Sequence, residues 1–116
     1  MDSMMYRLKI REEFNSIIAA GLTVEIDGEK YTLNPNTIES FTYFINTGVN
    51  VLFHSDSNAC REYTNDEISR ITNAYFDKYK NIKAEMDNLL LELYHMDHFA
   101  YEKVSLTEIL KMKGLI

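Results

Sequence analysis

Cysteine, proline and glycine are all scarce in this sequence of 116 residues. The one cysteine, Cys60, cannot form a disulfide within the chain and cannot supply a zinc cluster by itself. One proline and four glycines leave no Pro-rich or Gly-rich linker, and each glycine stands alone rather than in a phosphate-binding loop. A disulfide scaffold is therefore excluded, and we expect no nucleotide or other cofactor.

Long hydrophobic runs and an excess of basic residues are also missing. No apolar stretch approaches the ~20 residues that a membrane-spanning helix needs, and the first eleven residues do not resemble a signal peptide. A formal net charge of −6 disfavours contact with nucleic-acid phosphates, which depends on Lys and Arg. We expect neither a membrane nor a nucleic acid as partner, and one globular domain over residues 1–116.

Two β-hairpins are predicted from turn residues between alternating or apolar runs. Asp27-Gly28, between Leu22–Ile26 and Lys30–Leu33, is typical of a type I′ turn, because both residues tolerate a positive φ. The second hairpin joins Val49–Phe53 to Cys60–Tyr63 through the polar turn formers Ser55 to Asn58.

Helical spacing and capping residues predict four helices. Asn34 followed by Pro35 is a helix start, and Thr64 with Glu67 is a capping box that opens a long amphipathic helix. The predicted helices cover Ser3–Ala20, Pro35–Thr47, Asn65 to about His98, and Ser105–Lys113. The fold class is therefore α+β: two short β-hairpins packed with N-terminal and middle helices, one long amphipathic helix and a short final helix.

The long helix is too long for a compact domain of this size. From residue 65 to 98 it would extend ~50 Å at 1.5 Å per residue, so part of it should project or pair with another helix. Its apolar stripe runs from Ile68 to Leu93, and further apolar residues lie outside that stripe. We expect the surplus to support self-association or docking, and the predicted interaction residues are Tyr79, Met86, Leu90, Leu93 and Tyr94.

A metal site near the end of this helix is a weak alternative. His95 and His98 are three residues apart, with Asp97 between them and Glu92 one turn earlier. The spacing lacks a second ligand cluster elsewhere in the sequence. We therefore expect no bound metal.

The second hairpin carries the residues most suggestive of chemistry, namely His54, Asp56 and Cys60. An imidazole beside a thiol can activate it as a nucleophile. A tight turn offers neither a pocket nor an oxyanion site, however, so we expect Cys60 to pack at the base of the hairpin. Arg61 is expected to pair with Asp56 or Glu62, or to meet a partner.

The most specific residues of the segment from Gly21 to Ile71 are Phe53-His54-Ser55-Asp56, followed by Cys60-Arg61-Glu62-Tyr63-Thr64. On these residues the segment resembles a family of uncharacterised domains encoded in tailed bacteriophages and prophages, often beside tail-fibre and baseplate proteins. The resemblance extends to the order of the elements, which includes the Asp27-Gly28 turn. It places His54, Asp56, Cys60, Arg61 and Tyr63 in the motif hairpin.

The resemblance implies a phage structural or tail-assembly accessory rather than an enzyme. Such a protein would act through contacts with other phage structural proteins or with itself as a homo-oligomer, in the virion or in the cytoplasm of the infected bacterium. The alternative is a phage-encoded inhibitor of a host defence system that binds a host protein or a small signalling molecule. Small size and acidity fit both.

Overall fold

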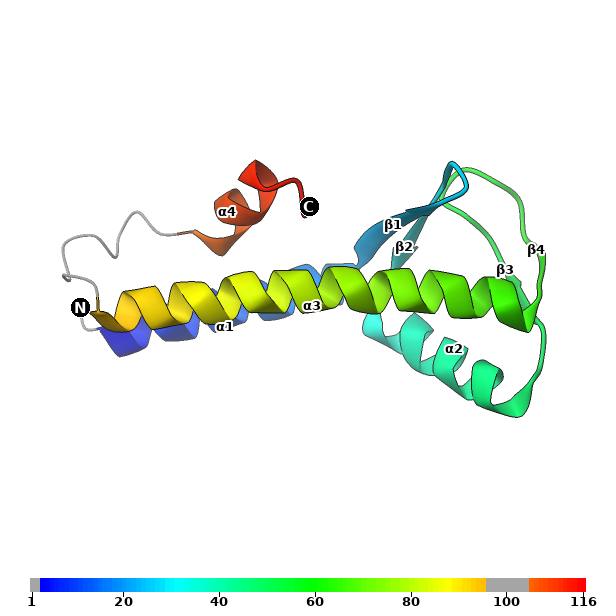
Figure 1. Ribbon diagram of the computed structural model, residues 1–116, viewed down its shortest axis with the longest axis horizontal. Coiled ribbons are helices and arrows are strands. Elements are labelled where there is room, and N and C mark those ends of the chain that lie inside the picture. The colour runs from blue at the N-terminus through cyan, green and yellow to red at the C-terminus, as the bar shows by residue number, and fades with distance from the viewer. Residues whose placement is uncertain (1–2, 96–104) are drawn as a thin grey trace.

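The long helix α3 (Asn65–His95) is the axis of the structure (Figure 1). The computed structural model describes residues 3–95 and 105–116, and its longest dimension is 53 Å. The other elements are α1 (Ser3–Ala20), β1 (Leu22–Ile26), β2 (Glu29–Leu33), α2 (Pro35–Thr47), β3 (Val51–Phe53), β4 (Arg61–Tyr63) and α4 (Leu106–Met112). The α+β fold class and the order of elements are confirmed.

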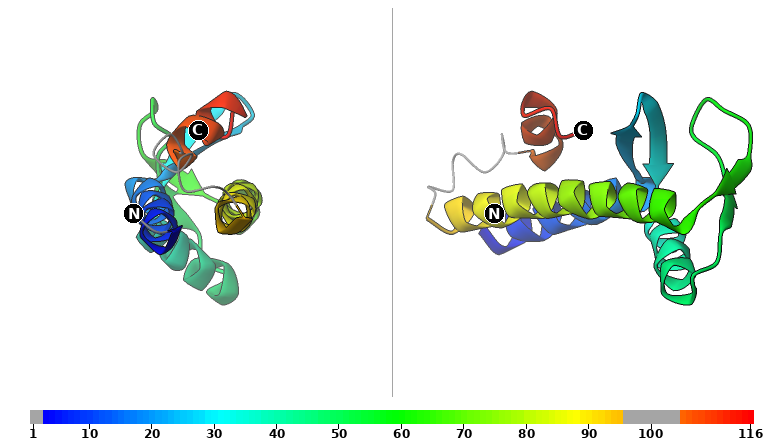
Figure 2. Two further views of the ribbon diagram at one scale, coloured as in Figure 1. Left: turned by 90° about the vertical axis from the view of Figure 1, so that its left-hand side faces the viewer. Right: turned by 45° about the vertical axis from the view of Figure 1, so that its right-hand side comes forward.

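The elements form a stem and a head. In the stem, α1 runs alongside the C-terminal half of α3 in the opposite direction, and α4 packs against both helices. In the head, α2 lies on one side of α3 and the two hairpins lie on the other (Figure 2). The part of α3 that exceeds the head therefore pairs with helices of its own chain. The predicted extension of α3 to His98 lies outside the described residues.

Local signals place the first hairpin and α2 as predicted. Asp27 and Gly28 have φ angles of 52° and 83°, as a type I′ turn requires, and Val24 pairs with Tyr31 in the antiparallel register. Asn34 caps α2 by accepting a hydrogen bond from the Thr37 N–H at 2.9 Å. These contacts are all short-range, which is why the sequence reveals them.

The second hairpin is shorter than predicted. Strand pairing is confined to Val51–Phe53 and Arg61–Tyr63, so Val49 and Cys60 lie outside the strands. Each hairpin is its own two-stranded sheet. The loop of the second nonetheless reaches the first, because the Asp56 N–H donates to the Lys30 carbonyl at 2.8 Å.

One hydrophobic cluster connects head and stem. Its most deeply buried side chains on α3 are Ile68, Ile82 and Leu93, each with no exposed surface. The cluster also takes in residues of every other element: Tyr6, Ile10, Phe14 and Ile18 of α1, Leu22 and Val24 of β1, Tyr31 and Leu33 of β2, Ile38 and Phe41 of α2, Val51 and Tyr63 of the second hairpin, and Leu106 and Leu110 of α4.

Glu13 of α1 holds the start of α4. Its carboxylate accepts hydrogen bonds from the Ser105 hydroxyl at 2.9 Å and from the backbone N–H groups of Leu106 at 3.2 Å and Thr107 at 2.6 Å. Burial raises the pKa of Glu13, but these hydrogen bonds together bring the pKa below its ordinary value. The first N–H groups of a helix have no partner within it, so Glu13 satisfies two of them from another element.

We expect Glu13→Ala to lower the free energy of unfolding by about 1–2 kcal/mol, because α4 loses a cap of the kind that typically contributes that much. Urea denaturation followed by circular dichroism measures this loss. Glu12→Ala, at the neighbouring exposed position of α1, is the matched control. Equal stabilities of the two variants would contradict the assigned role of Glu13.

Candidate functional site

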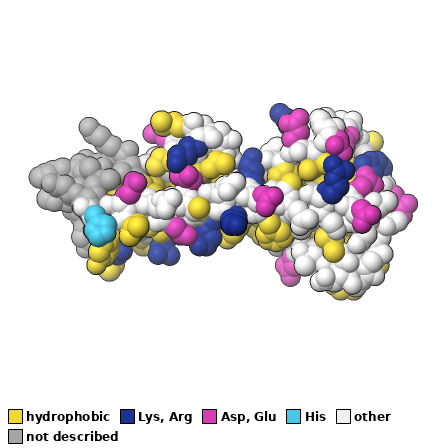
Figure 3. All heavy atoms as spheres, viewed as in Figure 1, with side chains coloured by type: hydrophobic (Ala, Val, Ile, Leu, Met, Phe, Trp, Pro, Cys, Tyr) yellow, Lys and Arg dark blue, Asp and Glu magenta, His cyan; other side chains and the backbone are white. Residues whose placement is uncertain are grey.

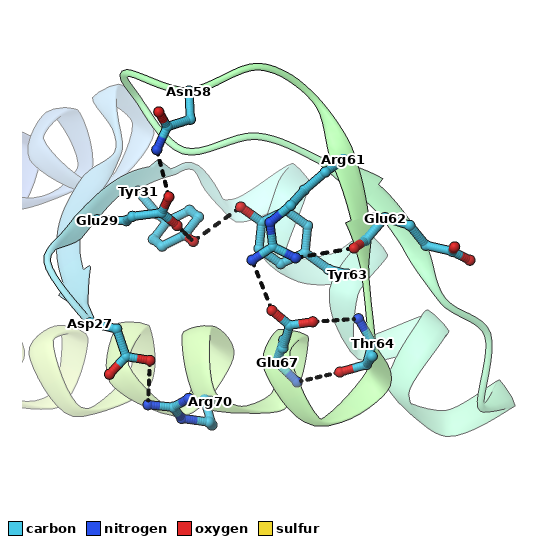
Figure 4. A network of polar contacts seen from close by, with 10 residues as sticks. All are labelled: Asp27, Glu29, Tyr31, Asn58, Arg61, Glu62, Tyr63, Thr64, Glu67 and Arg70. Carbon is cyan, nitrogen blue, oxygen red and sulfur yellow. Dashed lines mark hydrogen bonds and ion pairs between the residues drawn. The ribbon is translucent and has the colours of Figure 1, made fainter.

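A pocket of about 210 Å³ lies in the head, where the turn of the first hairpin, β4 and the start of α3 meet. Its charged lining consists of three acids and two bases, and Figure 4 shows them together with the two tyrosines of the lining. The lining residues are Ile26, Asp27, Glu29, Tyr31, Arg61, Tyr63, Glu67, Arg70 and Ile71. The pocket is the natural place to look for ligand chemistry in the head.

The capping box of α3 positions Glu67 in this pocket. The Glu67 carboxylate accepts from the Thr64 N–H at 3.1 Å, and the Thr64 hydroxyl accepts from the Glu67 N–H at 3.2 Å. Arg61 then donates to the free carboxylate oxygen of Glu67 at 2.8 Å. The hydrogen bond from Arg61, followed by that from Thr64, lowers the pKa of Glu67 to about 2.

Arg61 is held on three sides. Besides its pair with Glu67, it donates to the Glu62 carbonyl oxygen at 3.1 Å, and its guanidinium lies 3.7 Å from the centre of the Tyr63 ring. The predicted pairing with Glu62 is made through the Glu62 backbone carbonyl. The ion pair of Arg61 is instead with Glu67, in the first turn of the following helix, rather than with Asp56 or Glu62.

Two buried tyrosines join the hairpins below this ion pair. The hydroxyl oxygens of Tyr31 and Tyr63 are 3.0 Å apart, and Tyr31 donates to Glu29 at 2.7 Å. Burial, together with the hydrogen bonds to Tyr63 and Glu29, raises the pKa of Tyr31. Asn58 of the loop donates to the other oxygen of Glu29, so Tyr31, Tyr63 and Glu29 join the two sheets through hydrogen bonds.

Asp56 fastens the loop of the second hairpin to the edge of β2. Its carboxylate accepts from the Thr32 N–H at 3.0 Å and from the Thr32 hydroxyl at 2.8 Å. Asp56 therefore orients no imidazole. The motif residues Asp56, Arg61 and Tyr63 share one task, which is to join the second hairpin to the first hairpin and to α3.

A thiol nucleophile is not assembled in the second hairpin. The predicted packing of Cys60 at the hairpin base is wrong, because Cys60 is exposed. His54 is also exposed, and its Nδ1 lies 2.8 Å from the Ser55 carbonyl oxygen. The hydrogen bonds of these described residues do not join His54, Asp56 and Cys60 into a catalytic group.

The charges of the head pocket are largely matched against one another. Arg61 pairs with Glu67, and Arg70 pairs with Asp27 at 3.1 Å. Glu29 is occupied by Tyr31 and Asn58. A ligand would have to displace these contacts. The geometry therefore favours a structural role, in which these residues hold the two hairpins and α3 together, over a reaction centre.

The predicted interaction residues of α3 divide into two groups. Met86 and Leu93 are buried in the core against the rest of the chain, so neither is available to a partner. Tyr79 and Leu90 are half-buried, and Tyr94 is exposed. The division follows the helix circumference, because α1 and α4 cover the face that carries Met86 and Leu93.

An exposed apolar surface on the stem, which we call the stem face, consists of Met4, Leu8, Phe76, Leu91 and Tyr94. Arg7, between Met4 and Leu8 on α1, places its guanidinium 5.4 Å from the centre of the Tyr94 ring. Hydrophobic side chains gather beside the histidine at this end of the molecule (Figure 3). Met4 and Leu8 were not among the interaction residues predicted from the sequence. Their four-residue spacing, on the side of α1 away from its core residues, could have indicated an exposed apolar surface.

A groove of about 500 Å³ continues the stem face along α3. Aromatic residues and a lysine–aspartate pair line it: Phe76, Tyr79, Lys80, Lys83, Ala84 and Asp87. Lys83 and Asp87 form an ion pair at 2.9 Å within the helix. The groove is open, and it carries charge only at Lys80, Lys83 and Asp87.

The part of the chain that the structure describes contains no group of three His, Cys, Asp or Glu side chains suited to a metal ion. His95 is exposed there, whereas Asp97 and His98 lie outside the described residues. None of the helices in these ranges is long and apolar enough to cross a membrane.

Fold and site together define an α+β protein with a helical stem and a head in which two hairpins are joined to α3. No family model, curated protein or solved structure matches the chain. The phage resemblance of the motif hairpin therefore stays a prediction.

We expect Glu67→Gln to reduce the fall in stability that the wild-type protein shows as the pH is lowered. Because the folded pKa of Glu67 is about 2, its contribution is present above its ordinary pKa near 4.5 and is lost as the pH falls toward 2. The variant keeps a capping side chain but lacks this titration. The melting temperatures of the variant and of the wild type, measured from neutral pH to pH 2, should therefore converge at the lowest pH. Parallel profiles, or the same result with Asp66→Asn at the neighbouring position, would contradict the assignment.

Asp56→Ala is expected to loosen the joint between the hairpins while leaving the stem intact. Loss of both Asp56–Thr32 hydrogen bonds should cost about 1 kcal/mol and speed amide hydrogen exchange at Thr32. Hydrogen exchange read by NMR measures both head and stem in one sample. Unchanged protection of the Thr32 amide would show that Asp56 does not hold the loop.

Proposed function

We propose that this protein is a phage-encoded accessory that acts by protein–protein contact, in the virion or during tail assembly, and carries out no catalysis. The stem face carries this proposal. It presents five exposed apolar side chains on two neighbouring helices, and exposed apolar surface beyond scattered single residues marks interaction sites. The resemblance of the motif hairpin to phage tail-associated domains supplies the expected setting.

The internal matching of charges in the head supports contact rather than chemistry. The head residues that look most reactive hold the hairpins and α3 together, as the Arg61–Glu67 and Asp56–Thr32 contacts illustrate. Other phage structural proteins, or a second copy of this chain, are the partners that fit.

A host-directed inhibitor is the second candidate, and the head pocket is the observation that favours it. A pocket of about 210 Å³ with Arg61, Arg70 and two tyrosines has the residue types that bind anionic, planar small molecules. The three acids in the same lining oppose an anion, and both arginines already have carboxylate partners. The contact protein is therefore the leading proposal.

The location of the protein in infected cells tests the proposed function. Quantitative mass spectrometry of purified particles should find the chain at a fixed ratio to the major tail or capsid protein. The stem variant Leu91→Glu should reduce incorporation at least several-fold. The head variant Leu52→Glu should not, although Leu52 is also exposed, at 73% against 62% for Leu91.

Absence of the wild-type protein from particles, with abundance in the soluble fraction, would overturn a virion role and favour an assembly chaperone or the inhibitor. Equal incorporation of both variants would show that the stem face is not the contact surface. Circular dichroism of both variants checks that neither substitution unfolds the chain.

A further inference from the structure

Helix α3 carries a second heptad seam beside the one that forms its core. The core seam includes Tyr75, Ile82, Met86, Leu89 and Leu93. The second seam is offset by one residue and consists of Phe76, Lys80, Lys83, Asp87, Leu90 and Tyr94, at alternating spacings of four and three. Positions at this spacing lie along one side of a helix, and here apolar residues at both ends enclose three charged ones, Lys80, Lys83 and Asp87. Neither α1 nor α4 covers it fully, since Phe76 is 47% and Tyr94 65% exposed.

The second seam is complementary to a second, antiparallel copy of itself. Positions equally far from residue 85 pair Lys83 with Asp87, Phe76 with Tyr94, and Lys80 with Leu90. The central pair has opposite charges and the outer pair is aromatic on both sides. A parallel pairing in register would instead set Lys83 against Lys83 and Asp87 against Asp87. Charge complementarity therefore selects the antiparallel arrangement.

The same arrangement covers the exposed end of α1. Because α1 is antiparallel to α3 and Arg7 lies over Tyr94, Met4 and Leu8 belong to the end of the stem where Phe76 of an antiparallel copy would arrive. One two-fold operation thus brings Phe76 toward Tyr94, Met4 and Leu8, twice per dimer. The exposed apolar side chains of both helices become parts of one interface.

We propose that two copies of this chain associate through the second seam, with their α3 helices antiparallel and centred near residue 85, and with α1 of each copy at the edge of the interface. This rests on the proposed function, since it names a second copy as the occupant of the stem face. Lys83 and Asp87, which pair within one helix in the single chain, exchange partners across the two-fold axis. The polar centre fixes orientation and register, and the aromatic ends supply apolar contact.

Additional cations set the conditions under which the dimer forms. Lys80 lies in the second seam, and Arg11 of α1 is within electrostatic reach of Lys83. Their long side chains can extend to the rim of the interface, but their like charges repel across the two-fold. Screening at physiological ionic strength reduces that repulsion and the attraction of the central Lys83–Asp87 pairs alike, so association is best measured at that ionic strength.

Charge exchange between copies tests the pairing directly. Sedimentation equilibrium of the full chain, from micromolar to sub-millimolar concentration at physiological ionic strength, should show a monomer–dimer equilibrium. Lys83→Asp sets two acids against each other across the interface, and Asp87→Lys sets two bases, so each variant alone should dimerise at least tenfold more weakly. An equal mixture of the two variants should recover a heterodimer, and the double exchange should recover a homodimer.

The mixture separates a contact between copies from a contact within one helix. Mixing cannot restore the ion pair inside either α3, so recovery there reports only on the interface. Both side chains are about half exposed, and circular dichroism confirms that each variant folds. Glu92→Lys makes the same charge change as Asp87→Lys at an exposed position away from the second seam and should leave the dimer intact.

A wild-type chain that stays monomeric at every concentration would overturn the dimer, as would single variants that associate like wild type or a mixture that recovers nothing. If that monomer still enters phage particles through Leu91, the proposed function stands and the stem face takes a different protein. If the chain dimerises as described but is absent from particles, the virion role fails while the dimer stands.

Discussion

The continuous burial of one face of α3 is the constraint on which the rest of the structure depends. Isolated helices gain little from their own hydrogen bonds in water, so most of their stability comes from packing an apolar face. A helix of 31 residues needs such packing along its whole length. Helices α1, α2 and α4 and strand β1 each contact it in turn, and the shape of the molecule follows from laying short elements along this axis.

Head and stem use their polar residues differently. In the head, carboxylates, arginines and tyrosines form hydrogen bonds and ion pairs with one another. These contacts hold two small hairpins in place, each of which would be only marginally stable by itself. The pair Arg61–Glu67 and the contact of Asp56 with Thr32 connect segments that belong to different sheets and to α3. In the stem, by contrast, Lys83 and Asp87 lie on the surface among exposed aromatic and aliphatic side chains. The first pattern is typical of internal structure, and the second is typical of a surface that meets another protein.

Two adjacent seams allow α3 to fill the core of its own chain and, in the proposed dimer, to contact a second copy. The core seam is filled by residues of the same chain, and the second seam lies about one residue around the circumference. A partner helix on the second seam would extend the packing that α1 begins. The interface would then continue the core of the stem rather than add a separate patch to its surface.

The sequence by itself determined the local structure. The Asp27-Gly28 turn, the caps at Asn34 and Ser105, and the Thr64–Glu67 capping box all depend on hydrogen bonds or φ angles within a few residues, so the residues that make them are adjacent in the chain. Helical and alternating periodicity located the elements for the same reason.

Only the tertiary structure decided which apolar residues of α3 the chain covers for itself. Met86, Leu93, Leu91 and Tyr94 are all apolar or aromatic residues of one helix, yet Met86 and Leu93 are buried whereas Leu91 and Tyr94 are exposed. Periodicity gives the direction of a side chain around its helix but not the identity of the neighbour on that side. The partner of Arg61, the exposure of Cys60 and the cap that Glu13 provides to α4 depend in the same way on segments brought together by folding.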